Sequence, residues 1–238
     1  MKRIQRTIAL LAAVLIVIAG PAAAKEPQEL PQVTEDGLHL VPDSKMAIVY
    51  AEPGASLAGY RRVQLLDAYV AFRKNWERDQ RSRSAQALRV TSKDVENIKN
   101  KLAQEFHEVF TEVLEEGGYP VVDEAGEDVL LIRPAIINLD VNAPDTPQAG
   151  RTRSYVSSAG EMTLYVELYD SVTGDQIAKA LDRKADRSRD GYYTWANSVT
   201  NRTAARRILE GWATILVDAL NEAKERTTGT GNGAENGS

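Results

Sequence analysis

The segment from Gly160 to Leu181 constrains the fold of this chain more than any other. Its first half alternates between apolar residues (Met162, Leu164, Val166, Leu168) and wetter ones (Glu161, Thr163, Tyr165, Glu167, Tyr169). A period of two predicts a strand with one buried face. Short polar residues and a glycine follow from Asp170 to Asp175 and favour a tight turn, so the strand should return as an antiparallel hairpin.

Two longer segments have the three-and-four spacing of amphipathic helices. The first begins near Thr91 or Ser92 and ends at Gly117-Gly118, and the second runs from about Asn201 to Ala223. Neither helix can bury its apolar face alone, so both should pack on the sheet that contains the hairpin. The sequence therefore predicts an α+β fold, a mostly antiparallel sheet of about five strands with two amphipathic helices packed on one face.

Three other runs complete the predicted sheet: Ala47–Tyr50, Tyr60–Phe72 and 128–142. In the last of these, alternate residues from Val129 to Val141 are expected to form the buried face, and Pro134 is expected at a bulge or facing outward because proline cannot donate to a ladder. The arginine-rich segment 73–89 is expected to be a solvated loop or a frayed helical turn, with an anion-binding or partner-docking patch as the alternative.

The N-terminus has the pattern of a cleavable signal peptide. Lys2, Arg3 and Arg6 precede an apolar run of about 12 residues, which is shorter than the ~20 that a membrane span needs. We expect residues 1–24 to be a leader, 25–45 an extended arm, 46–226 a single α+β domain and 227–238 a disordered tail. A leader that is retained as an anchor is the alternative. Export would place the protein in the periplasm or outside the cell.

Composition excludes several classes of partner and chemistry. Removal of the leader would change the formal charge from -5 to -8, which leaves no electrostatic case for binding nucleic acid or an anionic membrane surface. The chain has no cysteine, so it has no disulfide, thiolate metal site, cysteine nucleophile or lipidation cysteine. Beyond the leader, the sequence predicts no transmembrane segment.

The sequence predicts no catalytic residue, no cofactor and no metal site. Its two histidines, His39 and His107, do not form a pair at ligand spacing, and no nucleophile elbow is present. Carboxylates are plentiful, and Glu161 with Glu167 on one strand face is the pair that acid–base chemistry would use. Ordinary solvated strand residues explain the same two positions.

Aromatic residues supply the candidate binding site. Tyr165 and Tyr169 flank Glu167 on the wetter face of the hairpin, while Tyr192, Tyr193 and Trp195 precede the last helix. Exposed aromatic side chains anchor partners or stack on sugars. They also cover sheet edges, which is the structural alternative. The six residues Tyr165, Glu167, Tyr169, Tyr192, Tyr193 and Trp195 are therefore candidate partner-binding residues.

Four motifs carry a resemblance to a known family. They are YAEPGASLAGYRRV (Tyr50–Val63), DVLLIRPAI (Asp128–Ile136), VELYDSVTGD (Val166–Asp175) and WATIL (Trp212–Leu216). Together they resemble a bacterial family of exported proteins of unknown function, domain-of-unknown-function family 3313. The resemblance implies an envelope location and an α+β fold, and it implies no activity or catalytic residue. Many members look like lipoproteins, but this chain lacks the cysteine that lipidation requires.

These observations favour a non-enzymatic periplasmic or envelope accessory or binding protein, whose partner is an envelope protein or a cell-wall component. Two alternatives stay open at this point. A hydrolase of envelope polymers would need two carboxylates about 5–10 Å apart. A small-ligand carrier would need an apolar cavity between sheet and helices.

Overall fold

The computed structural model describes residues 29–83, 90–141, 155–156, 160–185, 194–195 and 198–231. The chain divides into two units, Met1–Leu30 and Pro31–Ser238, and the description below concerns the second. The predicted leader lies outside the described residues. Within the described part, no helix is long and apolar enough to span a bilayer.

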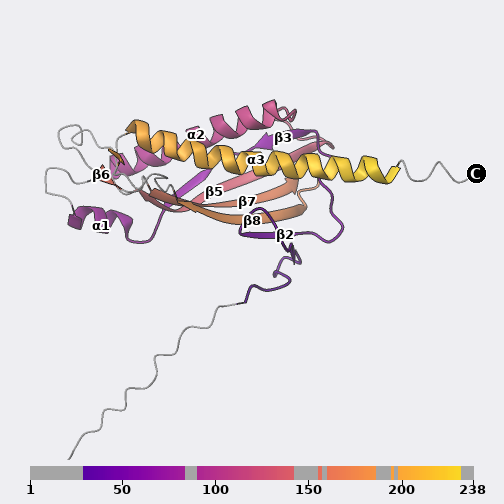
Figure 1. Ribbon diagram of the computed structural model, residues 1–238, viewed down its shortest axis with the longest axis horizontal. Coiled ribbons are helices and arrows are strands. Elements are labelled where there is room, and N and C mark those ends of the chain that lie inside the picture. Colours follow the sequence, from indigo (N-terminus) through magenta and orange to yellow (C-terminus); the bar gives the residue numbers. More distant parts are fainter. Residues whose placement is uncertain are drawn as a thin grey trace, which may run out of the picture. The chain divides into compact units, whose positions relative to one another are not determined.

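The described part of the chain is an α+β structure built on a seven-stranded sheet (Figure 1). Its strands are β1 (His39–Leu40), β2 (Ile48–Ala51), β3 (Arg62–Leu65), β4 (Tyr69–Phe72), β5 (Val129–Val141), β7 (Gly160–Asp170) and β8 (Gln176–Ala185). Two short strands, β6 (Tyr155–Val156) and β9 (Thr194–Trp195), pair separately. The helices are α1 (Trp76–Arg83), α2 (Ser92–Glu116) and α3 (Ser198–Gly231).

The strand order is β1-β2-β8-β7-β5-β3, and β4 also pairs with β5. Neighbouring strands are antiparallel except that β3 and β4 both run parallel to β5. The prediction of a mostly antiparallel α+β fold is confirmed, whereas the expected count of about five strands is wrong. Tyr60–Phe72, which reads as one strand, is broken between Leu65 and Tyr69 into β3 and β4.

The β7–β8 hairpin lies at the centre of the sheet, as its alternation predicts. Asp170 closes the turn because its carboxylate accepts the backbone N–H groups of Val172 and Thr173, at 2.9 and 2.8 Å. Gly174 takes a positive φ of 75°, which a residue with a side chain rarely adopts. Turn chemistry thus sets the register of the hairpin.

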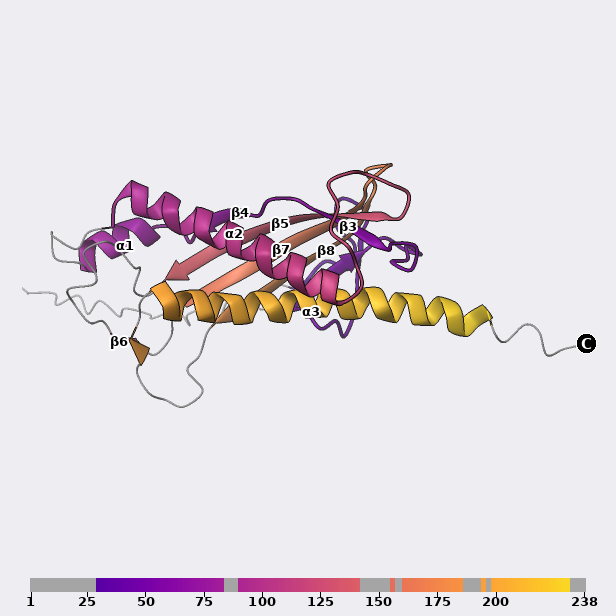
Figure 2. The same ribbon diagram turned by 90° about the horizontal axis from the view of Figure 1, so that it is seen from above.

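Helices α2 and α3 lie side by side over one face of the sheet (Figure 2). Helix α2 starts at a capping box, in which Thr91 and Asp94 satisfy each other's backbone N–H groups. Large side chains fill the layer between helices and sheet: Phe106, Phe110, Leu114, Leu130, Ile132, Ile136, Leu164, Leu209, Trp212 and Leu220 are all fully buried. Met162, Val166 and Leu168 complete the predicted stripe of β7, which is confirmed as core.

A buried charge joins α3 to the sheet. The Asp182 carboxylate accepts a 2.8 Å hydrogen bond from Trp212 Nε1 and a 3.2 Å bond from the backbone N–H of Ala47. Lys184 pairs with the same carboxylate at 3.1 Å. These contacts fix β8, the residues before β2 and the middle of α3 to one another.

The predicted buried face of β5 is wrong. Leu130, Ile132, Pro134 and Ile136 are buried, one residue out of phase with the expectation. Val129 and Leu139 at the two ends are buried as expected, and the register shifts between Ile137 and Asp140. Pro134 is buried rather than outward-facing. It lies opposite the break between β3 and β4, where β5 has no strand partner on that side, so its missing N–H costs no ladder bond.

The segment 73–89 contains a helix, α1, for which its charge-rich composition offered little signal. Trp76 anchors this helix: its side chain is 1% exposed, stacks on Phe72 with ring centroids 4.0 Å apart and donates to the carbonyl of Val141. Arg73 pairs with both Asp79 and Asp140, at 2.8 and 2.6 Å. The buried Trp76 side chain therefore anchors a helix in a segment whose charged composition predicts a solvated loop.

Candidate functional site

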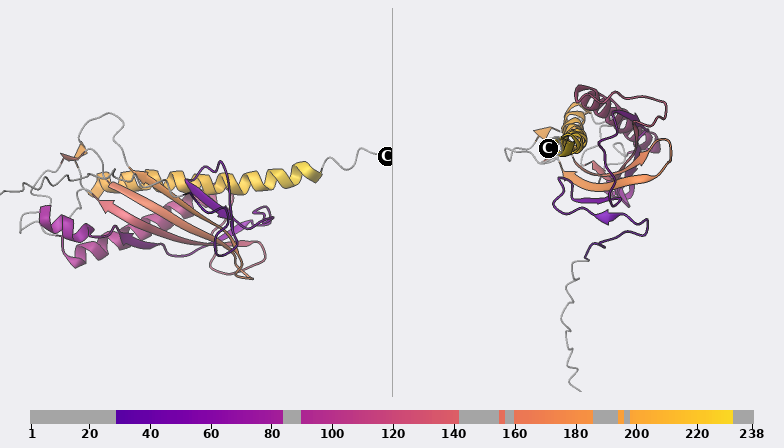
Figure 3. Two further views of the ribbon diagram at one scale, coloured as in Figure 1. Left: turned by 90° about the horizontal axis from the view of Figure 1, so that it is seen from below. Right: turned by 90° about the vertical axis from the view of Figure 1, so that its right-hand side faces the viewer.

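The face of the sheet away from α2 and α3 is called here the outer face (Figure 3). Since Leu164, Val166 and Leu168 of β7 point into the core, the alternate residues Tyr165, Glu167 and Tyr169 belong to the outer face. The registers of four strands place one row of side chains across it: Tyr50 on β2, Lys179 on β8, Glu167 on β7 and Arg133 on β5. Because paired residues of neighbouring strands point to the same face, these four side chains lie side by side.

Glu167 is the centre of a hydrogen-bond network on this face. Its carboxylate accepts from the Tyr165 hydroxyl at 2.7 Å and from Gln176 Nε2 at 3.4 Å, and it lies 3.5 Å from Arg133 NH1. The Glu167 side chain is only 16% exposed, whereas that of Arg133 is 67% exposed. The network therefore holds the carboxylate, while the Arg133 guanidinium that pairs with it remains largely exposed to solvent.

The tyrosines of the network are held in their neutral form. Partial burial, followed by the hydrogen bond to Glu167, raises the pKa of Tyr165 well above its usual value. Burial and the charge of Glu167 also raise the pKa of Tyr169. Both phenols therefore stay protonated further into the alkaline range than an ordinary tyrosine, as hydrogen-bonding groups with apolar rings.

Sequence reasoning missed two residues of this face, Tyr69 and Arg133. Tyr69 on β4 is 67% exposed and belongs to the row that passes through Ala135 and Tyr165. Leu66, just before β4, is also exposed. Arg133 could not be recognised from the sequence, because only the register of β5 against β7 shows that it lies opposite Glu167.

The other three predicted residues are not brought to this network by the described structure. Tyr192 and Tyr193 lie outside the described residues. Trp195 belongs to β9, whose backbone pairs with β6, and its side chain is not among those described. The candidate site therefore consists of Tyr69, Arg133, Tyr165, Glu167 and Tyr169, called here the open face.

The two carboxylates of the predicted pair, Glu161 and Glu167, lie far apart along β7. Glu161 and Glu167 are six residues apart on β7, which corresponds to about 20 Å at ~3.3 Å per residue. Glu161 pairs with Arg183 instead. Within the described residues, no three His, Asp or Glu side chains gather closely enough to hold a metal ion.

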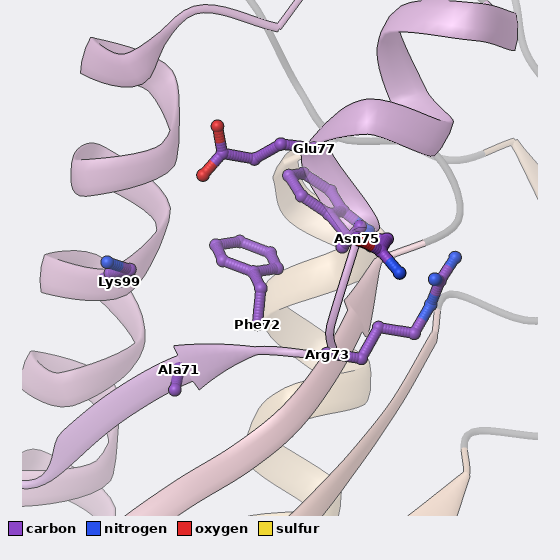
Figure 4. Close-up of a pocket in the computed structure, with 7 residues that line it drawn as sticks. Ala71, Phe72, Arg73, Asn75, Glu77 and Lys99 are labelled. Atoms are coloured by element: carbon purple, nitrogen blue, oxygen red, sulfur yellow. The ribbon is translucent and has the colours of Figure 1, made fainter.

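A pocket of about 280 Å³, separate from the open face, lies where β4, α1 and α2 meet (Figure 4). Phe72 forms part of its floor, and Lys99 and Glu77 stand on opposite sides of it. Lys99 pairs with Glu96 at 2.9 Å, and the guanidinium of Arg73 is occupied by two aspartates. Its charges are therefore largely satisfied within the protein.

A family model described as "Protein of unknown function (DUF3313)" matches residues 38–216, three-quarters of the chain. The chain belongs to the DUF3313 family. The resemblance drawn from the sequence motifs is thus confirmed. In this DUF3313 protein three of those motifs meet at one end of the sheet: Tyr60 donates to Asp170 at 2.9 Å, Arg62 pairs with Asp128, and Ser171 bonds to the backbone of Gly126. The family pattern therefore marks a structural junction.

A comparison with solved structures finds matches that share little sequence with this DUF3313 protein. The PelC dodecamer from Paraburkholderia phytofirmans has 12% identity and a TM-score of 0.35, over 68% of this chain and 93% of that one. Protein XCC0632 from Xanthomonas campestris has 12% identity and a TM-score of 0.37, over 75% and 93%. A DUF4136 family protein from Bacteroides thetaiotaomicron has 11% identity and a TM-score of 0.29, over 76% and 94%. No curated protein matches the chain.

Proposed function

We propose that this DUF3313 protein is a non-enzymatic binding protein of the cell envelope that docks a partner protein on its open face. The observation that carries the proposal is the contrast within that face between partly buried, hydrogen-bonded groups and strongly exposed ones. Glu167 and Tyr165 are held by hydrogen bonds, while Tyr69 and Arg133 are each two-thirds exposed beside them.

The chemistry of the open face favours a protein partner. Tyrosine and arginine are the side chains that most often dominate protein–protein binding energies, because they combine apolar area with directed hydrogen bonds. A network that is already ordered loses little further side-chain entropy when a partner binds. The envelope location rests on the leader-like N-terminus and on the family resemblance. The filled layer under α2 and α3 supports binding on the outer face rather than in the interior.

Photo-crosslinking in living cells tests this proposal. A photoreactive phenylalanine analogue is placed at Tyr69 and, as the matched control, at Val172, which is also exposed but lies on the β7–β8 turn. We expect a discrete protein adduct from position 69 that is absent from position 172. The adduct should be lost when Arg133→Glu is added, since this change reverses the exposed positive charge of the open face.

Other outcomes would contradict the proposal. Equal adducts from positions 69 and 172, or an adduct that survives Arg133→Glu, would mean that the open face is not the docking surface. A heterogeneous adduct that collapses on digestion with cell-wall hydrolases would identify a cell-wall polymer, not a protein, as the partner.

A further inference from the structure

The row of side chains that defines the open face continues beneath a segment of the chain itself. The register of β5, β7, β8 and β2 carries this row from Arg133 and Glu167 to Lys179 and Tyr50. Residues 31–41, called here the strap, contact the last two: the Tyr50 hydroxyl bonds to the carbonyl of Pro31, and Lys179 pairs with Asp36. The strap lies on the side of the sheet away from α2 and α3 (Figures 1 and 3). The strap thus covers the Lys179 and Tyr50 positions of a row that continues to Glu167 and Arg133.

The strap is a small hairpin held together by its own bonds. Thr34 and Leu38 exchange hydrogen bonds, Gly37 donates to the carbonyl of Thr34 with a φ of 82°, and Leu40 donates to the carbonyl of Gln32. Both partners of each of these bonds belong to the strap, so the bonds do not depend on the strands that the strap contacts. The segment can therefore move as a unit without losing its internal structure.

Few contacts hold the strap on the outer face. The Tyr50 hydroxyl donates to the carbonyl of Pro31 at 2.9 Å, and Asp36 pairs with Lys179. Leu38 is 3% exposed, yet it and Tyr50 belong to neither apolar cluster of the core. Beyond these side chains, the strap is joined to β2 by the two-residue strand β1 and by the bond from the Val41 N–H to the Val49 carbonyl.

We infer that the strap is a displaceable cover that masks part of the binding face. When it lifts, Lys179 and Tyr50 join Arg133 and Tyr69, and the exposed surface becomes larger and more basic. The strap places a carboxylate on Lys179, so a partner that displaces it must supply an acidic side chain at the same point. As a statement about binding this rests on the proposed function, but the cover itself is tested without any partner.

Nitration of tyrosines by tetranitromethane, mapped by peptide mass spectrometry, measures whether the strap lifts. Tyr69 is the exposed reference and the fully buried Tyr119 the protected one, while Tyr50 at 7% exposed reports on the strap. In Asp36→Lys, loss of the ion pair with Lys179 should raise the nitration rate of Tyr50 about two- to fivefold, the effect of losing one surface ion pair, with Tyr69 and Tyr119 unchanged. The control Glu161→Lys breaks the pair with Arg183 on the same face and should leave Tyr50 unchanged.

A locked strap supplies the converse measurement. The chain has no cysteine, so Asp36→Cys with Lys179→Cys introduces the only two thiols, which a short bis-maleimide can bridge. Bridging should return the Tyr50 rate to the wild-type value or below, while the unbridged double variant stays fast. If Tyr50 reacts equally in all these variants, or if its rate rises only together with that of Tyr119, the strap is an integral part of the fold and the inference is wrong.

A lifting strap and a binding open face can fail separately. If no crosslink forms at position 69 but the nitration rate of Tyr50 rises in Asp36→Lys, the proposed partner is refuted and the displaceable strap is supported. An intact crosslink with an unresponsive Tyr50 would do the reverse.

Discussion

At the scale of single residues, Asp182 is the charge on which the packing of α3 most depends. Replacement by alanine removes the acceptor of a buried indole N–H and leaves Trp212 unsatisfied beneath the helix. We expect Asp182→Ala to lower the free energy of unfolding by about 2–4 kcal/mol, the range for breaking a buried charged hydrogen bond. Urea denaturation measures this loss.

A double-mutant cycle with Trp212→Phe separates the hydrogen bond from the lost packing. The phenylalanine variant has no N–H to satisfy, so Asp182→Ala should cost less in its background than in the wild type. Additive losses in the two variants would show that the Asp182–Trp212 bond contributes nothing to stability.

Tyr60 should make stability depend on alkaline pH. Burial and its hydrogen bond to Asp170 raise the pKa of Tyr60 to about 12, against about 10 for an unperturbed phenol. A raised pKa in the folded state stabilises the protein fully below pH 10, and this contribution is lost as the pH rises through 12. Allowing for solvent screening of this partly exposed group, the contribution is about 1 kcal/mol.

The Tyr60→Phe variant isolates this group from the other tyrosines. Between pH 9 and pH 12 its urea midpoint should fall less steeply than that of the wild type, because the variant has no phenol to ionise at this position. Parallel slopes for the two proteins would contradict the assignment.

At the scale of elements, substitution by alanine should have opposite effects on stability at two glycines of the helical layer, Gly211 and Gly117. Gly211, in the middle of α3, has no atom within 4 Å of an added Cβ, so Gly211→Ala should stabilise the protein by about 1 kcal/mol through helix propensity. An added Cβ at Gly117 would lie 2.7 Å from Val217 Cγ1, where α2 ends against α3. Gly117→Ala should therefore destabilise by about 1–3 kcal/mol.

Thermal and urea unfolding of the two variants check this contrast. If Gly117→Ala is as stable as the wild type, α2 and α3 are not held at the close approach seen at this point. A loss of stability in Gly211→Ala would mean that the exposed face of α3 at residue 211 is covered by another part of the molecule.

At the scale of the whole molecule, the two apolar clusters should unfold together. The smaller one, formed by Trp76, Val90 and Val95, shares the flanking residues Phe72, Ile98 and Val141 with the main core. In a Trp195→Phe background, Trp76→Phe leaves only Trp212 to fluoresce and Trp212→Phe leaves only Trp76, so the two variants report on different clusters. We expect both fluorescence transitions to coincide with circular dichroism. A fluorescence change of the Trp76 region at lower urea would instead make α1 a separate unfolding unit.

The parts of the fold that could be predicted from sequence are those encoded by local periodicity. The β7 stripe, the turn at Asp170 and Gly174, and the two long helices follow from alternation, turn chemistry and three-and-four spacing, each of which acts within a few residues. The candidate residues Tyr165 and Glu167 were found in the same way, since they occupy the wetter positions of one strand.

Tertiary structure alone decided the rest, because long-range pairing overrides local pattern. The register of β5 against β7 placed Arg133 beside Glu167 and buried Pro134, and no local signal in 128–142 distinguishes its two faces, both of which are rich in apolar residues. Trp76 ordered α1 through contacts with Phe72 and Val141. The sequence by itself thus determined the central hairpin and the two long helices, because their patterns are local. The packing of distant segments determined α1, the break between β3 and β4, and which face of the sheet is free to bind.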